Sequence, residues 1–260
     1  MCLILIAYRC YPGIDLLVAA NRDEFYDRPT ARLAFWDDAP QVLAGRDLQH
    51  GGTWLGVTQT GRFAALTNYR DPRQVRPGAP SRGQLVSAYL QGVERATDYL
   101  ARLTTQFSHY NGFNLLLGDA AGLHYYSNRG DAPRTLPPGW YGLSNHLLNT
   151  PWPKLKRGLA LVQSALAQQP EPVPDDLLPA LTDRAPAPDA ALPRTGVPLE
   201  WERWLSPIFI EAPGYGTRSS TVLLTKESGL ALMVEITWLD GGRCEFTLNG
   251  LSERGDGPRH

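Results

Sequence analysis

Cys2-Leu-Ile-Leu-Ile-Ala-Tyr8 is a continuous apolar run, and Ile14-Asp-Leu-Leu-Val-Ala-Ala20 follows it after a Pro12-Gly13 turn. Two such runs joined by a turn signal predict a β-hairpin. Both runs are apolar on both faces, whereas a strand with one face in water alternates apolar and polar residues. We therefore expect the hairpin to lie in a sheet that is covered on both sides.

Further strands and helices are predicted by the patterns in the rest of the chain. Residues 53–58 and 62–67 predict a second hairpin, and residues 82–92 show the apolar spacing of a helix. Other expected strands are residues 113–118, 123–127, 219–225, 230–237 and 243–248. Other expected helices are residues 97–103 and 152–168, with short helical pieces at 175–181 and 201–205. Strands at both ends that enclose helices in the middle predict a layered α+β domain with sheets covered by helices.

The length and charge of the chain limit its organisation and its partners. The 260 residues, 43% hydrophobic and 20% charged, fit a globular protein, and we expect a single domain over residues 1–260. Residues 170–198 contain eight prolines, so we expect a surface excursion within that domain and not a linker. The 25 basic and 26 acidic residues give a formal charge of −1, which argues against a nucleic-acid partner.

Three further features bear on the compartment of the protein. No apolar run approaches the ~20 residues of a membrane-spanning helix, so no transmembrane segment is expected. The run at residues 2–8 is too short for a signal peptide and has no basic leader. Cys2, Cys10 and Cys244 in a chain without a leader indicate reduced thiols and not a disulfide framework. We therefore expect a cytoplasmic protein.

Cys2 is the most informative single residue. Removal of Met1 would leave a cysteine whose free α-amine and thiol are attached to the same Cα. The α-amine titrates at about 7.7–8.0 and the thiol at about 8.5, so the amine can act as the base for its own side chain. The alternative is that Cys2 is a small hydrophobic residue at the edge of a strand.

A polar cluster, Asn21-Arg22-Asp23-Glu24, abruptly ends the second strand of the hairpin. The start of the first strand of a hairpin lies beside the end of the second, so we expect Asp23 to be close to the Cys2 amine. A carboxylate at that place would orient the amine and hold its charge state. The alternative is a charged turn that closes the hairpin.

Three polar residues near strand ends are candidates for a supporting role. Asn68 and Asn145 each end an apolar strand, where a side-chain amide can stabilise an oxyanion, although asparagine is also an ordinary turn residue there. Arg218 follows the turn Gly214-Tyr-Gly and enters a strand. It could bind a substrate carboxylate or brace the Cys2–Asp23 pair, and a surface arginine is the alternative.

Other catalytic and binding motifs are weak or absent in the sequence. The five histidines show no metal-ligand spacing, and there is no Cys-x-x-Cys pair. The chain has no phosphate-binding loop and no Gly-x-Ser-x-Gly elbow. We therefore expect neither a metal site nor a required cofactor.

Several longer motifs, spread in order along the chain, resemble those of the NRDE family of transport and Golgi organisation proteins. They are Met1-Cys2, Ala20-Asn-Arg-Asp-Glu-Phe-Tyr26, Arg28-Pro29, Gly51-Gly-Thr-Trp-Leu-Gly56, Ala65-Leu-Thr-Asn-Tyr69, Tyr110-Asn-Gly-Phe-Asn114, Tyr141-Gly-Leu-Ser-Asn145, Thr150-Pro-Trp152 and Gly214-Tyr-Gly-Thr-Arg218. From these motifs we expect Asn21, Arg22, Trp54 and Tyr69 to contact a substrate.

The pattern is also similar, more distantly, to cysteine N-terminal-nucleophile (Ntn) hydrolases such as bile-salt hydrolases and penicillin V acylases. The resemblance implies a four-layer αββα sandwich with two antiparallel sheets flanked by helices. It also implies a catalytic set of Cys2, Asp23, Asn68, Asn145 and Arg218. Bile-salt hydrolases carry an arginine just before the Asn-x-Asp motif, where this chain has Ala20. The arginine at Arg22 is expected on the opposite face of the strand.

Three functions are compatible with these observations. The first is hydrolysis or transfer of an acyl group of a small-molecule amide, with Cys2 as nucleophile. The second, which the family resemblance implies, is binding and trafficking of haem, a lipid or acyl-CoA in the same pocket, with haem as a ligand and not a required cofactor. The third is a scaffold with a relic pocket, because a fold does not fix a function.

Overall fold

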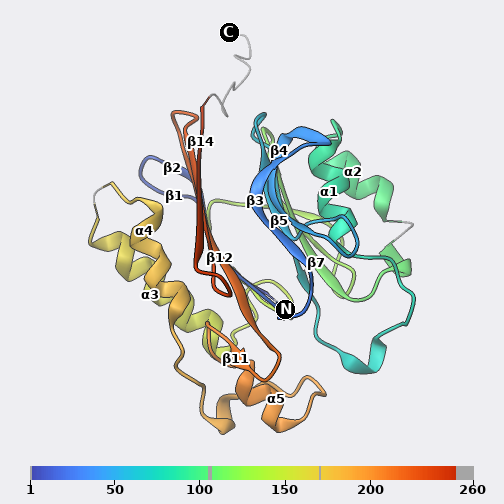
Figure 1. Ribbon diagram of the computed structural model, residues 1–260. Helices are drawn as coiled ribbons and strands as arrows, with labels where there is room; N and C mark the ends of the chain where they lie inside the picture. Colours follow the sequence, from blue (N-terminus) through green and yellow to red (C-terminus); the bar gives the residue numbers. More distant parts are fainter. Residues whose placement is uncertain (1, 105–106, 170, 250–260) are drawn as a thin grey trace.

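The computed structural model describes residues 2–104, 107–169 and 171–249, and its strands form two antiparallel sheets (Figure 1). The first sheet contains both ends of the described chain and has the strand order β10-β1-β2-β12-β13-β14, with β11 beside β12. Its strands are β1 (Cys2–Tyr11), β2 (Ile14–Phe25), β10 (Gly139–Leu143), β11 (Glu211–Ala212), β12 (Tyr215–Lys226), β13 (Ala231–Thr237) and β14 (Gly242–Leu248).

The second sheet is a meander in which each strand pairs with the next along the chain. Its strands are β3 (Thr30–Trp36), β4 (Ala39–Asp47), β5 (Leu55–Thr58), β6 (Phe63–Asn68), β7 (Phe113–Asp119), β8 (Gly122–Ser127) and β9 (Arg134–Leu136). The predicted hairpin of residues 53–67 is confirmed as β5 and β6. Strands β3, β4 and β9 were not predicted from the sequence, and β3 pairs with β4 through two irregularities that break the alternation of residues.

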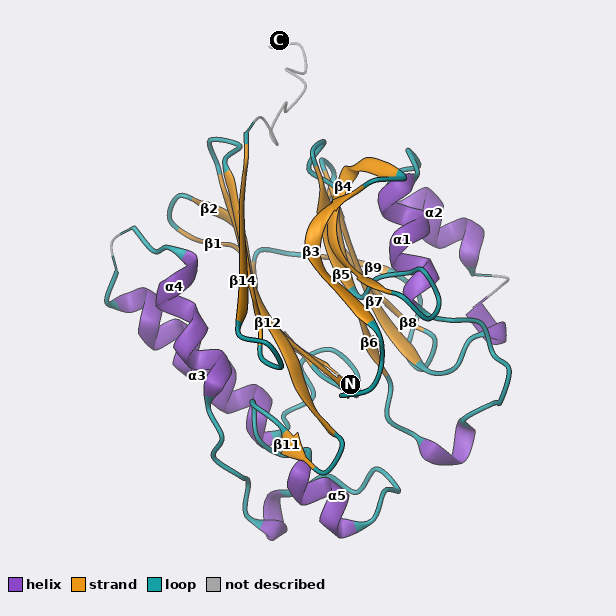
Figure 2. Ribbon diagram, viewed as in Figure 1, coloured by secondary structure: helices purple, strands orange, loops and turns teal. Residues whose placement is uncertain are grey.

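Helices cover the outer face of each sheet (Figure 2). Helices α1 (Gly83–Gln91) and α2 (Ala96–Leu103) pack on the second sheet, and α3 (Pro153–Ala167) and α4 (Pro174–Leu177) pack on the first. The remaining helical segments are α5 (Leu199–Trp204), η1 (Pro72–Gln74), η2 (Phe107–His109), η3 (Leu178–Thr182) and η4 (Asp189–Ala191). The predicted four-layer α+β sandwich is therefore confirmed. Within the described residues, no helix is both long enough and apolar enough to cross a membrane.

The apolar faces of the first hairpin explain why it lies inside the sandwich. Ile4 and Val18 belong to the core between the two sheets, whereas Leu5 and Leu17 belong to the core between the first sheet and α3. Successive side chains of a strand point to opposite faces, so the even-numbered residues at 4–8 and 16–20 face the second sheet and the odd-numbered residues at 3–7 and 17–19 face the helices. The expectation of a sheet covered on both sides is confirmed.

Helix α3 runs parallel to β1 along the outer face of the first sheet. A Cβ at Gly158 would lie 2.8 Å from Leu5 Cδ1, so this part of the helix is in close contact with the middle of the strand. At the other end of α3, the Tyr11 hydroxyl donates a hydrogen bond of 2.9 Å to the Leu166 carbonyl. The start of the helix therefore lies at the start of β1.

The proline-rich stretch is only partly a surface excursion. Its short helical piece forms where the sequence predicts it, as α4 and η3. Leu177, Ala180 and Leu181 in these elements are buried in the core between α3 and the first sheet. Pro174 and Pro179 stand in the first turns of α4 and η3, where proline is tolerated, and the apolar residues of these elements still reach the core.

Candidate active site

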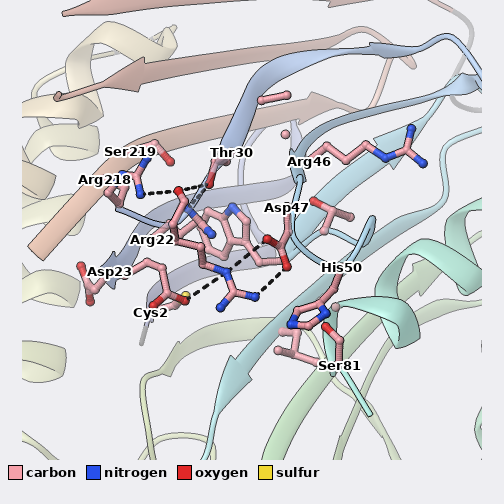
Figure 3. Close-up of a pocket in the computed structure, with 18 of the residues that line it drawn as sticks. Cys2, Arg22, Asp23, Thr30, Arg46, Asp47, His50, Ser81, Arg218 and Ser219 are labelled. Atoms are coloured by element: carbon pink, nitrogen blue, oxygen red, sulfur yellow. Dashed lines mark hydrogen bonds and ion pairs between the residues drawn. The ribbon is translucent and has the colours of Figure 1, made fainter. Parts of the chain in front are cut away.

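A cavity of about 340 Å³ lies between the two sheets, at the place where β1 begins and β2 ends (Figure 3). Charged side chains dominate its wall. The arginines are Arg22, Arg28, Arg32, Arg46, Arg82 and Arg218, and the acids are Asp23, Glu24, Asp47, Glu235 and Asp240. Cys2, Trp54 and Asn68 also line it.

Cys2 is at the inner end of this cavity. It is 7% exposed, and its backbone carbonyl accepts a hydrogen bond of 3.3 Å from Ser144 Oγ. Burial raises the pKa of the Cys2 thiol, and the nearby carboxylate of Asp23 raises it further. Arg22 and the backbone N–H of Asp23 have the opposite effect and lower the pKa of the thiol. The thiol is therefore buried next to the cavity, with a cation and a backbone donor close to it.

Asp23 lies one residue beyond the partner of Cys2 in the hairpin, because Cys2 is paired with Arg22. It is 1% exposed, and its Oδ1 accepts a hydrogen bond of 2.8 Å from Thr217 Oγ1. The Tyr215 hydroxyl donates to the backbone carbonyl of Asp23 at 3.0 Å. Burial raises the pKa of Asp23, while Lys154 is the side chain that lowers it most. The expected proximity of Asp23 to Cys2 is found, and Met1 lies outside the described residues.

The two residues that precede Asp23 point to opposite faces of β2. Arg22 faces the cavity, and its Nη1 donates to Thr30 Oγ1 at 3.2 Å. Asn21 does not line the cavity, because its amide donates to the carbonyls of Leu181 and Ile208 in the outer layer. The expected difference in face between Ala20 and Arg22 is wrong: both face the second sheet, as residues two apart on a strand do.

The two predicted oxyanion residues are adjacent, but only one of them reaches the cavity. Asn68 lines the cavity, and no described residue makes a hydrogen bond with its side-chain amide. Asn145 is fully buried behind it, and its Nδ2 donates to the Asn68 carbonyl at 3.0 Å. The Oδ1 of Asn145 accepts from Ser144 Oγ at 3.3 Å and from Arg70 Nη2 at 3.4 Å. Asn145 therefore supports Asn68 from outside the cavity wall.

The other predicted residues are divided between the cavity and its surroundings. Arg218 lines the cavity at a bulge in the pairing of β12 with β2, and its Nη1 donates to the carbonyls of Phe25 and Arg28. It thus holds the loop that follows β2, and its side chain makes no hydrogen bond with the described atoms of Cys2. Trp54 lines the cavity, whereas Tyr69 does not, because its ring packs on His146 at a centroid distance of 4.9 Å.

Several cavity residues were not predicted as site residues. Arg28 binds Asp47 through two hydrogen bonds of 3.1 and 2.8 Å and lies 3.9 Å from Glu24. Arg82 precedes α1 and donates to the Gly112 carbonyl at 3.1 Å. Glu235 is a buried charged residue on the same face of β13 as the core residues Ala231 and Met233. A charge at an apolar position of a strand is visible in the sequence and could have marked Glu235 as a candidate site residue.

The cavity arginines differ in their ion pairs. Arg28, Arg32 and Arg46 form ion pairs with carboxylates, but Arg22, Arg82 and Arg218 form none with the described residues. The inner part of the cavity is therefore suited to an anionic group. No cluster of three or more metal-ligating side chains occurs among the residues that the structure describes.

Comparison with known proteins identifies the relatives of this chain. The mouse Transport and Golgi organization 2 homolog is 38% identical over 270 residues, covering 96% of this chain and 97% of that protein. The human homolog is 36% identical over 260 residues, covering 92% and 94%. A C2A mutant of conjugated bile acid hydrolase from Clostridium perfringens is 10% identical with a TM-score of 0.43, covering 95% of this chain and 92% of that one.

A second solved structure has a similar score. It is the Caenorhabditis elegans ortholog of N-acylethanolamine-hydrolyzing acid amidase, which is 11% identical with a TM-score of 0.42 and covers 85% of this chain and 92% of that one. The family model named Transport and Golgi organisation 2 matches residues 1–240. The chain therefore belongs to the Transport and Golgi organisation 2 family, whose NRDE motif is Asn21-Arg22-Asp23-Glu24 in this sequence.

Proposed function

We propose that the cavity hydrolyses or transfers the acyl group of a small-molecule amide, with Cys2 as the nucleophile. The observation that carries the proposal is the position of Cys2. It is buried at the first residue of β1, lines the cavity between the two sheets, and lies beside the buried carboxylate of Asp23. A purely structural cysteine needs neither a cavity nor an acid beside it.

The reaction proceeds in two steps in this proposal. After removal of Met1, the α-amine of Cys2 takes the thiol proton, and Sγ attacks the amide carbon. The Asn68 amide donates to the oxyanion, and the amine product leaves with the proton as a thioester forms on Cys2. Water then attacks the thioester to release the acid, or an acceptor takes the acyl group. Asp23 orients the α-amine, and Asn145 positions Asn68 by donating a hydrogen bond to the backbone carbonyl of Asn68.

An anionic group on the substrate fits the charge of the cavity wall. Arg22 and Arg218 come from the first sheet and Arg82 from the segment before α1, so they can approach one group from two sides. Arginine binds carboxylate or phosphate with paired N–H donors. We therefore place the acyl amide with its reacting carbonyl at Cys2 and its anionic end toward these arginines.

Acyl transfer to Cys2 can be tested by trapping the covalent intermediate. The purified protein is incubated with an anionic activated acyl ester, and the adduct is located by intact and peptide mass. We expect one acyl group on Cys2 in the wild type and in Cys10→Ala, and none in a folded Cys2→Ala variant. The same intact mass reports whether Met1 is removed. Equal labelling of Cys2→Ala and the wild type would contradict the proposal.

A carrier function is the second candidate, favoured by the same three arginines without acidic partners. They could bind the carboxylates of haem or the phosphates of acyl-CoA without any reaction at Cys2. Stoichiometric haem titration separates the two candidates. A shift of the haem absorption band that Cys2→Ala leaves unchanged, together with no acylation of Cys2, would favour the carrier. Acylation that haem does not inhibit would favour the enzyme.

A further inference from the structure

Lys154 is a buried cation that the proposed reaction does not use. It is 4% exposed and belongs to the buried stripe of α3 together with Gly158, Val162 and Leu166. Its Nζ has no hydrogen-bond partner among the described residues. A lysine is almost never fully buried without a partner, because taking the ammonium out of water is costly. Its position therefore needs an explanation.

The packing of α3 places Lys154 next to the start of β1. Gly158 contacts Leu5, and the helix runs parallel to the strand. Lys154 comes four residues before Gly158, which is a rise of about 6 Å along the helix. On β1, Leu3 comes two residues before Leu5, which is a similar distance of about 6.6 Å, and Leu3 directly follows Cys2. Lys154 thus lies behind the first sheet, on the face opposite to the main cavity.

Titratable groups from four other segments of the chain act on the charge of Lys154. They are Cys2 of β1, Asp23 of β2, Arg70 of the segment after β6, and Glu202 of α5. Arg70 and Glu202 form a buried ion pair of 2.8 Å, so the charge of Glu202 is already balanced. Asp23 is the acid whose charge acts on both Lys154 and Cys2.

The space around Lys154 excludes a direct role in ligand binding. Lys154 does not line the main cavity. The separate cavity that it lines with Arg70 and Glu202 has a volume of only about 10 Å³. A cavity of this volume has room for at most about one water molecule. Lys154 can therefore act on the main cavity only through its neighbours, and of these Cys2 and Asp23 line that cavity.

We propose that Lys154 is a positioning residue that acts from behind the first sheet, where its positive charge stabilises the Cys2 thiolate. The role in catalysis rests on the proposed function, but the effect on the thiol does not. A single buried positive charge near a thiol favours the loss of its proton. The neighbouring Arg22 on the cavity side acts in the same direction.

The titration of Lys154 agrees with this role. Burial lowers the pKa of Lys154 to about 8, and Asp23 opposes the decrease. The side chain therefore carries its charge at pH 7 and loses it as the pH rises through about 8. The stabilisation of the thiolate is present below this pH and fades above it.

The test measures the reactivity of Cys2 without any substrate. Cys10 and Cys244 are replaced by serine, and the rate of Cys2 alkylation by iodoacetamide is followed by peptide mass from pH 5.5 to 9.5. At pH 7 we expect Lys154→Met to react about tenfold more slowly, since one pKa unit is a tenfold change in thiolate. We expect Lys154→Arg to stay within about threefold of the parent because it keeps the charge.

A matched control is available on the same helix. Lys156 is exposed, so Lys156→Met removes the same charge from α3 and is expected to leave the alkylation profile unchanged. Circular dichroism and thermal unfolding establish that each variant is folded. Should Lys154→Met not fold, the smaller change Lys154→Gln carries the same expected slowing.

The outcomes separate this inference from the proposed function. A folded Lys154→Met or Lys154→Gln protein with the parent's pH profile would overturn the inference, even if Cys2 is acylated. Slower alkylation that Lys154→Arg restores would support it. If Cys2 is never acylated while its alkylation still depends on Lys154, the proposed function fails and the inference stands.

Discussion

Arg70 shows how a charged residue is accommodated in the interior near Cys2. Its Nη1 donates to Glu202 Oε2 at 2.8 Å, and both side chains are at most 5% exposed. The guanidinium also lies over Trp152, with Cζ 4.9 Å from the ring centroid. Two buried charges nearly offset their desolvation when paired, but either one alone is strongly destabilising.

We expect Arg70→Met to lower the free energy of unfolding by about 3–5 kcal/mol, because Glu202 is left as an unpaired buried charge. The double variant Arg70→Met/Glu202→Leu should lose less than the single variant. Urea unfolding at pH 7 measures both. The matched control is the exposed pair of Arg203 and Asp189, where Arg203→Met should cost at most about 1 kcal/mol. A double variant less stable than Arg70→Met would contradict this account.

At the scale of elements, the stretch between α3 and α5 is an integral part of the outer core. Leu181 in η3 is fully buried, and the Leu181 carbonyl accepts the hydrogen bond from Asn21 of β2. Asn21 therefore ties a proline-rich segment to the strand that carries Asp23. This contact gives Asn21, unlike the other members of the polar cluster, a role in packing and not in the cavity wall.

We expect Leu181→Ala to destabilise the protein by about 2–5 kcal/mol, because it opens a cavity between α3 and the first sheet. The control is Leu199→Ala, at a leucine that is 51% exposed, for which we expect a change within about 0.5 kcal/mol. Thermal or urea unfolding measures the difference. Equal stability of the two variants would show that η3 is dispensable for the core.

The predictable part of the site is the part that local pairing determines. The turn after β1 sets the register that brings Cys2 beside Arg22 and Asp23, so sequence pattern alone placed Asp23 near Cys2. The pairing of Arg28 with Asp47 depends on how the loop after β2 meets the second sheet, which no local pattern encodes. The position of Lys154 in the apolar stripe of α3 was visible in the sequence. The residues that surround Lys154 could not be predicted, because they depend on how α3 packs against β1.

At the scale of the molecule, Glu235 connects the two sheets. It extends from β13 in the first sheet, and its Oε1 accepts a hydrogen bond of 2.8 Å from the Leu33 N–H of β3 in the second. Its Oε2 accepts from Thr221 Oγ1 at 3.4 Å. The side chain is 5% exposed, and burial raises the pKa of its carboxyl group. The bulge in β3 that obscured this strand in the sequence lies next to the same contact.

The raised pKa of Glu235 predicts a pH dependence of stability. The folded state holds the proton more tightly than the unfolded state, so this residue's contribution to stability decreases as the pH rises from about 4.5 through its folded pKa. We expect the free energy of unfolding of wild type, minus that of Glu235→Gln, to decrease over this range. Urea unfolding between pH 4.5 and 7.5 measures the difference. A difference that increases with pH would refute the assignment.

The pairing of β2 with β12 has a consequence for synthesis of the chain. Asn21 and Ser220, which are paired in the first sheet, are 199 residues apart in sequence. While the ribosome makes those intervening residues, β2 has one edge with unpaired backbone groups, and such edges recruit other strands. A chain that stops before residue 215 would keep this edge open permanently. Premature termination late in the gene should therefore yield an aggregating product and not a slightly shortened protein.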